Sequence, residues 1–337
     1  MTKPAAVLVG HLDYFFAPVR EALAAKGHAF IHFKTPAEFL AHPEALNDAA
    51  VILAHGFVPV SAETLSRAPR LKAVISTWMG AEGFDENAAT ARGIVIGNGA
   101  IPENAESMAE ATVMMLLSCL YDVNATQQRF RDHIWGQPLL TARMLKGKTV
   151  GLFGYGAIAR GIVQRLTGWG VSFLATTRHP PVEPGPVRFV ALDEMLPAAD
   201  ILCILAPLTD ATRGLFNAER LARMKRGSIL ICTSRGGIVD EAALYTLAKD
   251  GHFASLGLDV FQTEPLEKDS PLRALPNAFL TPHGIGHTQE ARKRLIEVGV
   301  ENVMRVLANK PPLYVCNPDV LPRWRGRIAR AAGALQT

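Results

Sequence analysis

Four polar side chains lie at or just beyond the ends of short apolar runs, and they carry groups that catalysis uses. They are Arg235, Asp259, Glu264 and His283. A histidine titrates near physiological pH and can move a proton, and a neighbouring carboxylate stabilises its charged form. Arginine offers a planar pair of donors to an anion. Each residue alone has an ordinary structural explanation, but the set predicts acid–base chemistry on an anionic substrate.

A glycine-rich turn precedes all four of these residues. The apolar run 149–153 leads into Gly154 and Gly156, and apolar residues then repeat at helical spacing from Ile158. Gly154 can take a tight turn, Gly156 has no side chain to block a pyrophosphate, and Ala159 is small enough for a helix to lie on the strand. The N–H groups that open the helix would face an anion. This predicts a phosphate-binding turn, and a merely tight strand–helix turn is the alternative.

Two series of short, β-branched runs alternate with helix-like spacers and would position these residues. Such alternation predicts parallel sheets covered by helices on both faces. The first series, without a phosphate turn, comprises 5–10, 29–33, 51–54, 71–76 and 94–97. The second comprises 149–153, 171–176, 201–205, 228–232, 255–259 and 278–280. Six strands match a dinucleotide-binding sheet, whose ligand crevice lies beyond the carboxyl ends of its strands.

The length of 337 residues exceeds the usual single core and predicts two domains. We expect 1–102 to form the first segment of a substrate-binding domain, 103–287 a Rossmann NAD(P)-binding domain, and 288–337 to return to the first domain. The fold class is then α/β, with two doubly wound parallel-sheet domains, Rossmann-like or flavodoxin-like. The active site is expected in the cleft between them.

The composition argues against several classes of protein. With 49% hydrophobic and 20% charged residues, the chain reads as a globular protein. No apolar run reaches the roughly 18 residues that span a bilayer, and no secretory signal is recognisable, so we expect a cytoplasmic protein. A net charge of +4 without long basic runs argues against nucleic-acid binding, and the basic stretch 323–330 is expected to be a solvated helix face. The four cysteines are far apart, so neither disulfides nor a metal site are expected.

Four motifs, in order, resemble those of the D-isomer-specific 2-hydroxyacid dehydrogenase family. They are the glycine turn 154–159, Cys232-Thr-Ser-Arg-Gly236, Gly257-Leu-Asp-Val-Phe261 with the following Glu264 and Pro265, and Thr281-Pro-His283. The resemblance extends from about Leu71 to Arg292, and it is greatest to the NADPH-preferring glyoxylate/hydroxypyruvate reductases.

The resemblance implies that His283 is the acid/base, Glu264 its carboxylate partner and Arg235 the substrate anchor. Reduction of a 2-keto acid needs a hydride at the carbonyl carbon, a proton at its oxygen and a cation on its carboxylate. Arg235 can bind the carboxylate and polarise the carbonyl, and His283 can donate the proton or accept it in the reverse direction. The resemblance adds backbone N–H groups of the loop Met79-Gly80-Ala81 as a second carboxylate anchor, although an ordinary loop is the alternative.

The resemblance also implies a nicotinamide dinucleotide, which supplies the hydride, with Asp259 facing its nicotinamide end. The expected cofactor-binding residues are Met108, Gly154, Tyr155, Gly156, Ala157, Ile158, Thr177, Arg178, His179, Ala206, Pro207, Thr212, Thr233, Ser234, Arg235, Asp259, His283 and Gly286.

The second expected strand ends in Thr177-Arg178-His179, without the acidic residue that would hold the ribose 2′-hydroxyl of NAD. Thr177 can donate a hydrogen bond to a 2′-phosphate, and Arg178 can neutralise it. We therefore expect NADP(H) to be preferred over NAD(H). If Arg178 instead points to solvent, either cofactor would be accepted.

Glyoxylate and hydroxypyruvate are the substrates that the resemblance implies, whereas Trp78 and Met79 could instead admit a bulkier apolar keto acid. Phosphoglycerate dehydrogenase activity is a weaker option, because a phosphorylated substrate would require further cations. Formate dehydrogenases of the family pair their histidine with glutamine, so Glu264 argues against that activity. A dinucleotide-sensing, corepressor-like binding protein is the alternative from another class, and the sequence offers no linker or disordered tail for it.

Two positions depart from the family pattern. Ala159 replaces the third glycine, and Gly284 stands where a branched residue more often follows the histidine, which leaves the shape of the nicotinamide pocket open. His287 is expected to cap the next helix or to face solvent. Family members are usually homodimers, and we expect the apolar helix 105–120 at such an interface, although a helix buried within the chain would look the same.

Overall fold

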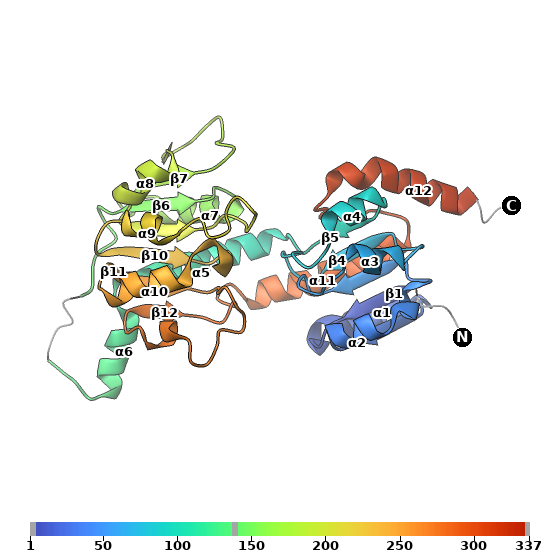
Figure 1. Cartoon of the computed structure of the whole chain (residues 1–337), viewed down its shortest axis with the longest axis horizontal. Helices are drawn as coiled ribbons and strands as arrows, with labels where there is room; N and C mark the ends of the chain where they lie inside the picture. Colours follow the sequence, from blue (N-terminus) through green and yellow to red (C-terminus); the bar gives the residue numbers. More distant parts are fainter. Residues whose placement is uncertain (1–4, 137–140, 334–337) are drawn as a thin grey trace. The chain divides into compact units, whose positions relative to one another are not determined.

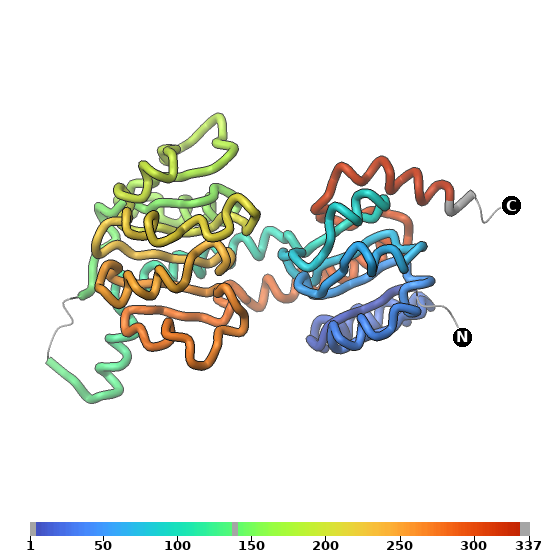
Figure 2. Tube along the Cα trace, in the orientation of Figure 1, coloured from blue at the N-terminus to red at the C-terminus, as the bar shows by residue number. Residues whose placement is uncertain are grey.

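The computed structural model describes residues 5–136 and 141–333. The chain divides into two compact units, shown in Figure 1: unit 1 comprises Met1–Glu103 and Gln289–Thr337, and unit 2 comprises Asn104–Thr288. Figure 2 traces the chain from unit 1 into unit 2 through helix α5 (Pro102–Leu120) and back through α11 (Gln289–Leu307). The substrate-binding and cofactor-binding roles expected of these segments stay predictions.

Unit 1 is built on five parallel strands in the order β2-β1-β3-β4-β5. The strands are β1 (Ala6–Val9), β2 (Phe30–Phe33), β3 (Val51–Ala54), β4 (Ala73–Ser76) and β5 (Val95–Gly97). The helices are α1 (Asp13–Ala25), α2 (Pro36–Ala41), α3 (Ala62–Ser66), α4 (Glu86–Ala91), α11 and α12 (Leu321–Gly333), with 3₁₀ turns η1 (Pro43–Leu46) and η4 (Pro318–Val320). This confirms the predicted doubly wound parallel sheet.

Alternate residues along each strand of unit 1 enter two separate cores. In β3, Val51 and Leu53 pack with α1, α11 and α12, whereas Ile52 and Ala54 pack with α2 and α3. Side chains of a strand point alternately to opposite faces, so the all-apolar sequence of β3 buries both. Helices therefore cover both faces of this sheet, as the continuous apolar runs predict.

Unit 2 contains seven parallel strands in the order β12-β11-β10-β9-β6-β7-β8. They are β6 (Thr149–Phe153), β7 (Ser172–Thr176), β8 (Val187–Phe189), β9 (Ile201–Ile204), β10 (Ser228–Cys232), β11 (Phe253–Leu258) and β12 (Ala278–Leu280). The expectation of six strands was wrong, because β8 has only three residues and follows a proline-rich stretch. The order reverses direction between β6 and β9, which is the point where open α/β sheets bind ligands.

Helices also cover both faces of the sheet in unit 2. One core contains residues of α8 (Leu192–Ala198), α9 (Ala218–Ala222) and α10 (Glu241–Lys249), and the other contains residues of α5 and α7 (Ala157–Leu166). The remaining elements are α6 (Val123–Arg131), η2 (Gly236–Ile238) and η3 (Pro271–Ala274).

The apolar side of α5 belongs to the core of unit 2. Met115 and Leu116 are fully buried against the sheet, and Cys119 lies beside them. This face of α5 is therefore used inside its own domain, so the expected dimer contact through α5 does not follow from its apolar sequence.

The basic stretch 323–330 is more than a solvated helix face, which corrects the expectation for it. Arg323 donates to the carbonyl oxygens of Thr90 (3.0 Å) and Ala91 (2.9 Å), and Arg327 donates to that of Pro69 (2.8 Å). The last carbonyls of a helix have no partner within it, and Arg323 satisfies two of them at the end of α4.

The four cysteines are reduced, as expected from their spacing. Three are buried and Cys316 is half-buried. Burial raises the pKa of Cys203 to about 12 and that of Cys119, Cys232 and Cys316 to about 11, so these thiols are weak nucleophiles. Among the helices in the described part of the chain, none is long and apolar enough to cross a membrane.

Candidate active site

The glycine turn after β6 has the geometry of a phosphate-binding turn. Gly154 has φ of 97°, and a side chain there would place Cβ 2.7 Å from the backbone nitrogen of Ala206, so only glycine fits. A Cβ on Gly156 would meet nothing within 4 Å. Gly156 is the N-cap of α7 and has no side chain to satisfy the first N–H groups, while Ala159 is fully buried. The turn thus leaves helix N–H groups open to an anion, which fits the pyrophosphate of a dinucleotide.

The loop after β7 lies next to this turn. The N–H of Gly154 donates to the carbonyl oxygen of Thr176 at 2.9 Å, and Thr177 and Arg178 follow directly. Arg178 is exposed, and no described acidic side chain pairs with it. A guanidinium at the end of the second strand of such a sheet can reach a ribose 2′-phosphate.

Three of the four candidate catalytic residues follow neighbouring strands at one edge of the sheet. Arg235 comes three residues after β10, Asp259 directly after β11 and His283 three residues after β12. These strands are parallel and adjacent. The carboxyl ends of these strands therefore lie side by side. Glu264, in the loop after β11, joins the three residues that follow them.

His283 and Glu264 form a direct pair. The Nδ1 atom of His283 lies 2.6 Å from Oε2 of Glu264, and Oε1 of Glu264 accepts the N–H of Phe261 at 2.9 Å. The side chains are 33% and 28% exposed, so the pair is accessible to a ligand. Partial burial opposes ionisation of Glu264, but its hydrogen bonds with His283 and Phe261 and the charges of His283 and Arg235 hold its pKa below the usual range. Glu264 is therefore ionised near neutral pH.

Asp259 holds the loop on which His283 stands. It is 2% exposed, and its Oδ1 accepts hydrogen bonds from the hydroxyl of Thr281 (2.7 Å) and from the N–H groups of Gly284 (2.9 Å) and Ile285 (3.1 Å). Its carbonyl oxygen accepts the N–H of His283 at 2.7 Å. Asp259 thus fixes the backbone on both sides of the histidine, and its expected contact with the cofactor stays a prediction.

Other expected cofactor-binding residues come from the same edge of unit 2. Gly286 approaches Met108 so closely that a Cβ on the glycine would lie 2.1 Å from the methionine sulfur. Thr233 lies 3.1 Å from Thr112, hydroxyl to hydroxyl. Ser234 follows directly, and its buried hydroxyl lies beside the thiol of Cys232.

The remaining expected cofactor residues lie in loops around the glycine turn. Ala206 and Pro207 follow β9, and the hydroxyl of Thr212 donates to the carbonyl oxygen of Pro207 at 2.8 Å. Tyr155 stacks edge-on against Phe189, with ring centroids 5.0 Å apart. The other members of the set are Ala157 and Ile158, which open α7, and His179 in the loop after β7.

The loop Met79-Gly80-Ala81 lies in unit 1, after β4, and its carbonyl groups are held there. Gly99 N–H donates to the carbonyl oxygen of Trp78 (2.9 Å), Asn98 Nδ2 to that of Met79 (2.8 Å) and Ser76 Oγ to that of Gly80 (2.5 Å). In the part of the chain that the structure describes, the N–H groups of Gly80 and Ala81 donate to no carbonyl or side chain. Two adjacent donors without acceptors suit a carboxylate.

A second glycine explains the close packing of this anchor loop. A Cβ on Gly56, in the loop after β3, would lie 1.9 Å from the carbonyl oxygen of Gly80. Of the two apolar side chains named for substrate choice, Trp78 packs against the core of unit 1, whereas Met79 is 42% exposed.

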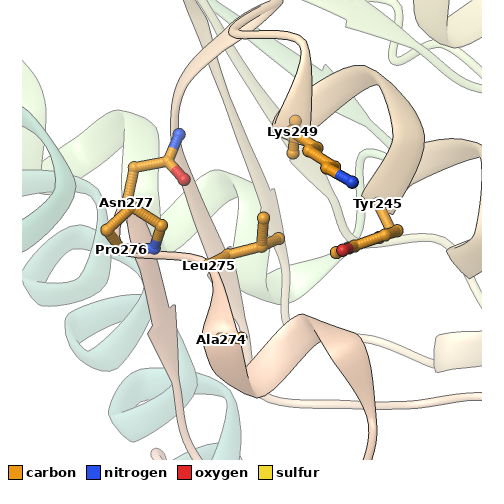
Figure 3. Close-up of a pocket in the computed structure, with 7 residues that line it drawn as sticks. Tyr245, Lys249, Ala274, Leu275, Pro276 and Asn277 are labelled. Carbon is orange, nitrogen blue, oxygen red and sulfur yellow. The ribbon is translucent and has the colours of Figure 1, made fainter.

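Two further features of unit 2 are His287, whose Nδ1 would lie 3.4 Å from a Cβ on Gly284 beside His283, and a separate pocket. His287 is exposed, and its N–H donates to the carbonyl oxygen of Gly284 at 3.0 Å, just before α11. A pocket of about 340 Å³ lies between α10 and the segment that precedes β12, and it is lined by Tyr245, Lys249 and Leu275 (Figure 3). It is at the amino end of β12, whereas His283 follows the carboxyl end. No three metal-ligating side chains come together among the residues described.

Sequence reasoning missed the residues that support the site. Ser76 and Asn98 hold the anchor loop, Gly56 gives it room, and Gln262 connects the loops of Arg235 and Glu264. Gly56, two residues after an apolar strand, was a signal of close backbone approach. Nothing in the sequence marks the other three.

Comparison with known proteins agrees with this geometry. Residues 113–284 match the model of the D-isomer specific 2-hydroxyacid dehydrogenase, NAD binding domain. A D-3-phosphoglycerate dehydrogenase from Mycobacterium bovis is 36% identical over 271 residues, which are 79% of this chain and 51% of that protein. A glyoxylate reductase from Thermofilum pendens is 36% identical over 272 residues, covering 78% and 79%.

A similar solved structure is that of an NADPH-dependent glyoxylate/hydroxypyruvate reductase from Sinorhizobium meliloti, in complex with NADP and malonate. It has a TM-score of 0.84 at 30% identity and covers 95% of this chain and 98% of that one. The chain spans about half the length of the phosphoglycerate dehydrogenases that it matches. The matched domain, the strand order and the relatives agree, and the chain belongs to the D-isomer specific 2-hydroxyacid dehydrogenase family.

Proposed function

We propose that this chain is an NADP(H)-dependent reductase of small 2-keto acids, with glyoxylate or hydroxypyruvate as its substrate. The observation that carries the proposal is the pair of His283 Nδ1 and Glu264 Oε2 at 2.6 Å, within reach of the charge of Arg235. A proton donor, its carboxylate partner and a cation are the protein groups that reduction of a 2-keto acid needs.

In this proposal Arg235 binds the substrate carboxylate through its guanidinium and polarises the neighbouring carbonyl. Glu264 accepts a hydrogen bond from the Nδ1–H of His283 and so orients the ring, and the imidazolium form of His283 donates its Nε2 proton to the carbonyl oxygen. Bound NADPH would supply the hydride. In the oxidation of a 2-hydroxy acid, the neutral imidazole of His283 accepts the hydroxyl proton.

The anchor loop of unit 1 supports the same substrate class. Gly80 and Ala81 offer two adjacent N–H groups, and backbone donors of this kind suit a carboxylate. We assign them to the substrate carboxylate, together with Arg235. The exposed side chain of Met79 is the group that we assign to the rest of the substrate.

The preference for NADP(H) rests on Thr177 and Arg178. The loop they form lies beside the glycine turn, contains no acidic residue and presents an exposed guanidinium. A carboxylate at this place would repel a 2′-phosphate, whereas Arg178 attracts it. The NADPH-dependent reductase from S. meliloti is consistent with this choice.

We also propose a homodimer, with the contact formed by Phe130 of α6 and by Trp135. Phe130 is 64% and Trp135 76% exposed, and their rings lie 6.0 Å apart, centroid to centroid. Figure 1 places α6 at the margin of unit 2, next to β12, where Asn124 donates to the carbonyl oxygen of Ala278 at 3.1 Å. Exposed aromatic clusters of this kind are typical of protein interfaces.

NADPH oxidation against glyoxylate, hydroxypyruvate, pyruvate, phenylpyruvate and 3-phosphohydroxypyruvate, repeated with NADH, tests the proposed function. We expect the highest kcat/KM with NADPH as the cofactor and glyoxylate or hydroxypyruvate as the substrate. Turnover of phenylpyruvate alone would move the substrate assignment to bulky apolar acids, and tight NADPH binding without any turnover would favour a sensor.

A further inference from the structure

Gln262 ties the loop that carries Glu264 to the loop that carries Arg235. Its main-chain N–H donates to Oε1 of Glu241, and its side-chain Nε2 donates to the carbonyl oxygen of Val239 at 3.2 Å. Val239 and Glu241 follow Arg235 closely in the sequence. The acceptors of both hydrogen bonds therefore lie in the segment that follows Arg235.

The two loops also meet backbone to backbone. A side chain on Gly236 would place Cβ 1.9 Å from the carbonyl carbon of Phe261 and 2.2 Å from its oxygen, so glycine alone permits this approach. Phe261 in turn donates its N–H to Oε1 of Glu264 at 2.9 Å. Gly236, the residue after Arg235, thus packs against Phe261, whose N–H donates to the carboxylate of Glu264.

Glu241 is held in an unusual electrostatic position. It opens α10 directly after Asp240, whose carboxylate caps the helix by accepting the N–H groups of Ala242 and Ala243, both at 3.1 Å. Burial raises the pKa of Glu241, the N–H of Gln262 opposes this, and the negative charge of Glu264 adds to it. A half-buried carboxylate beside a second one is unfavourable without a specific contact, and Gln262 provides that contact.

We propose that Glu241 and Gln262 are positioning residues: they fix the His283–Glu264 pair relative to Arg235. The proposal rests on the proposed function, because Arg235 is assigned there to the substrate carboxylate and His283 to its carbonyl oxygen. The carboxylate and the carbonyl group of a 2-keto acid are directly bonded to each other. The proton donor that serves the carbonyl oxygen and the cation that binds the carboxylate must therefore keep one fixed separation. A displacement of about 1 Å between such groups can cost on the order of 100-fold in rate.

The test compares Glu241→Ala, Glu241→Gln and Gln262→Ala with wild type in NADPH-dependent reduction of glyoxylate and hydroxypyruvate. We expect Glu241→Ala to lower kcat by at least about tenfold and to change KM by no more than about twofold, because Arg235 still binds the carboxylate. Glu241→Gln keeps an oxygen acceptor for the N–H of Gln262 and should restore most of kcat. Gln262→Ala loses only the bond to Val239 and should have the smaller effect.

Glu219→Ala is the matched control, because Glu219 is an exposed acidic residue in the first turn of the neighbouring helix α9. Its kcat and KM should equal those of wild type. Wild-type kcat in Glu241→Ala would overturn the proposal. So would a joint loss of kcat, substrate affinity and thermal stability that Glu241→Gln fails to restore, since that pattern describes a structural role.

A second readout does not depend on turnover. The Nδ1 proton of His283, shared with Glu264, is followed by its downfield proton NMR signal, which is assigned by its loss in His283→Ala. We expect this signal to shift or broaden in Glu241→Ala and to return in Glu241→Gln, whereas an unchanged signal in Glu241→Ala contradicts the proposal. If wild type reduces no keto acid, the proposed function fails, and this signal still decides the positioning role.

Discussion

The imidazole of His283 and the carboxylate of Glu264 meet at 2.6 Å, and each residue makes a further hydrogen bond that holds it in place. Glu264 accepts a second hydrogen bond from Phe261, and the N–H of His283 donates to the carbonyl oxygen of Asp259 at 2.7 Å. His283 has φ of 51°, in the left-handed region that non-glycine residues rarely adopt. Strain of this kind persists where the surroundings enforce it, and here Asp259 enforces it.

The first prediction concerns the pH dependence of Glu264. Its pKa is lowered in the folded chain from an ordinary value of 4.5, so its ionised form stabilises the fold. This stability is fully present above the unfolded-state pKa and is lost as the pH falls through the folded-state pKa. The free energy of unfolding of wild type should therefore exceed that of Glu264→Gln at about pH 5, and the difference should shrink as the pH falls further.

Urea unfolding of both proteins between neutral and acidic pH measures this difference. Glu267→Gln, which changes an exposed carboxylate in the same loop, is the control and should show no such trend. A wild-type advantage that persists unchanged at the acid end would mean that the ionised form of Glu264 is not the stabilising one.

The second prediction concerns the anchor loop. Gly56→Ala would place a methyl group 1.9 Å from the carbonyl oxygen of Gly80, so the loop must move. Displaced N–H donors lose hydrogen bonds to a charged carboxylate, each worth about 1.5 to 3 kcal/mol. We expect KM for the keto acid to rise by about tenfold or more. Gly326→Ala, where nothing lies within 4 Å of the new carbon, should leave KM unchanged, and an unchanged KM in both variants would refute the anchor role.

The third prediction concerns Arg178. Replacing it with alanine removes the cation assigned to the 2′-phosphate, so KM for NADPH should rise by about tenfold or more while KM for NADH stays the same. Arg188→Ala is a suitable control, because Arg188 lies on the neighbouring strand β8 and pairs with Glu194. If Arg178→Ala weakens both cofactors equally, Arg178 does not select NADP.

The fourth prediction concerns assembly. Phe130→Asp combined with Trp135→Asp puts two charges into the proposed dimer contact, where aromatic anchors contribute about 2 kcal/mol or more each. Sedimentation should show a dimer for wild type and a monomer for this variant at micromolar concentration, with unchanged circular dichroism. Val182→Asp, at a fully exposed apolar side chain, should remain dimeric. A monomeric wild type would rule out the homodimer.

The sequence predicted the positions of most strands better than it predicted the loops. The runs around Val51, Val150 and Ile229 are continuously apolar because both faces of each sheet are covered, and such runs are conspicuous. The strand β8 was not predicted, because only Val187 of its three residues is buried. A short edge strand carries too few apolar positions to show a pattern.

The candidate residues after the strands were visible because parallel strands deliver their ends to one edge. The supports of these residues were not visible, since they depend on which loops pack together. Gln262 and Glu241 are far apart in the sequence, and only the close approach of Gly236 to Phe261 brings their loops into contact. The same holds for Asp259, whose three hydrogen bonds end on residues after β12.

The most direct test of the central claim is NADPH oxidation with glyoxylate and hydroxypyruvate by wild type and His283→Ala. General acid–base catalysis by a positioned side chain contributes about 100-fold to 10,000-fold, so we expect kcat to fall by that range in the variant. NADPH binding by the variant, measured by fluorescence, should still be detected, which separates loss of the proton donor from loss of the cofactor site. Retention of wild-type kcat in His283→Ala, or the absence of turnover by wild type, would contradict the account.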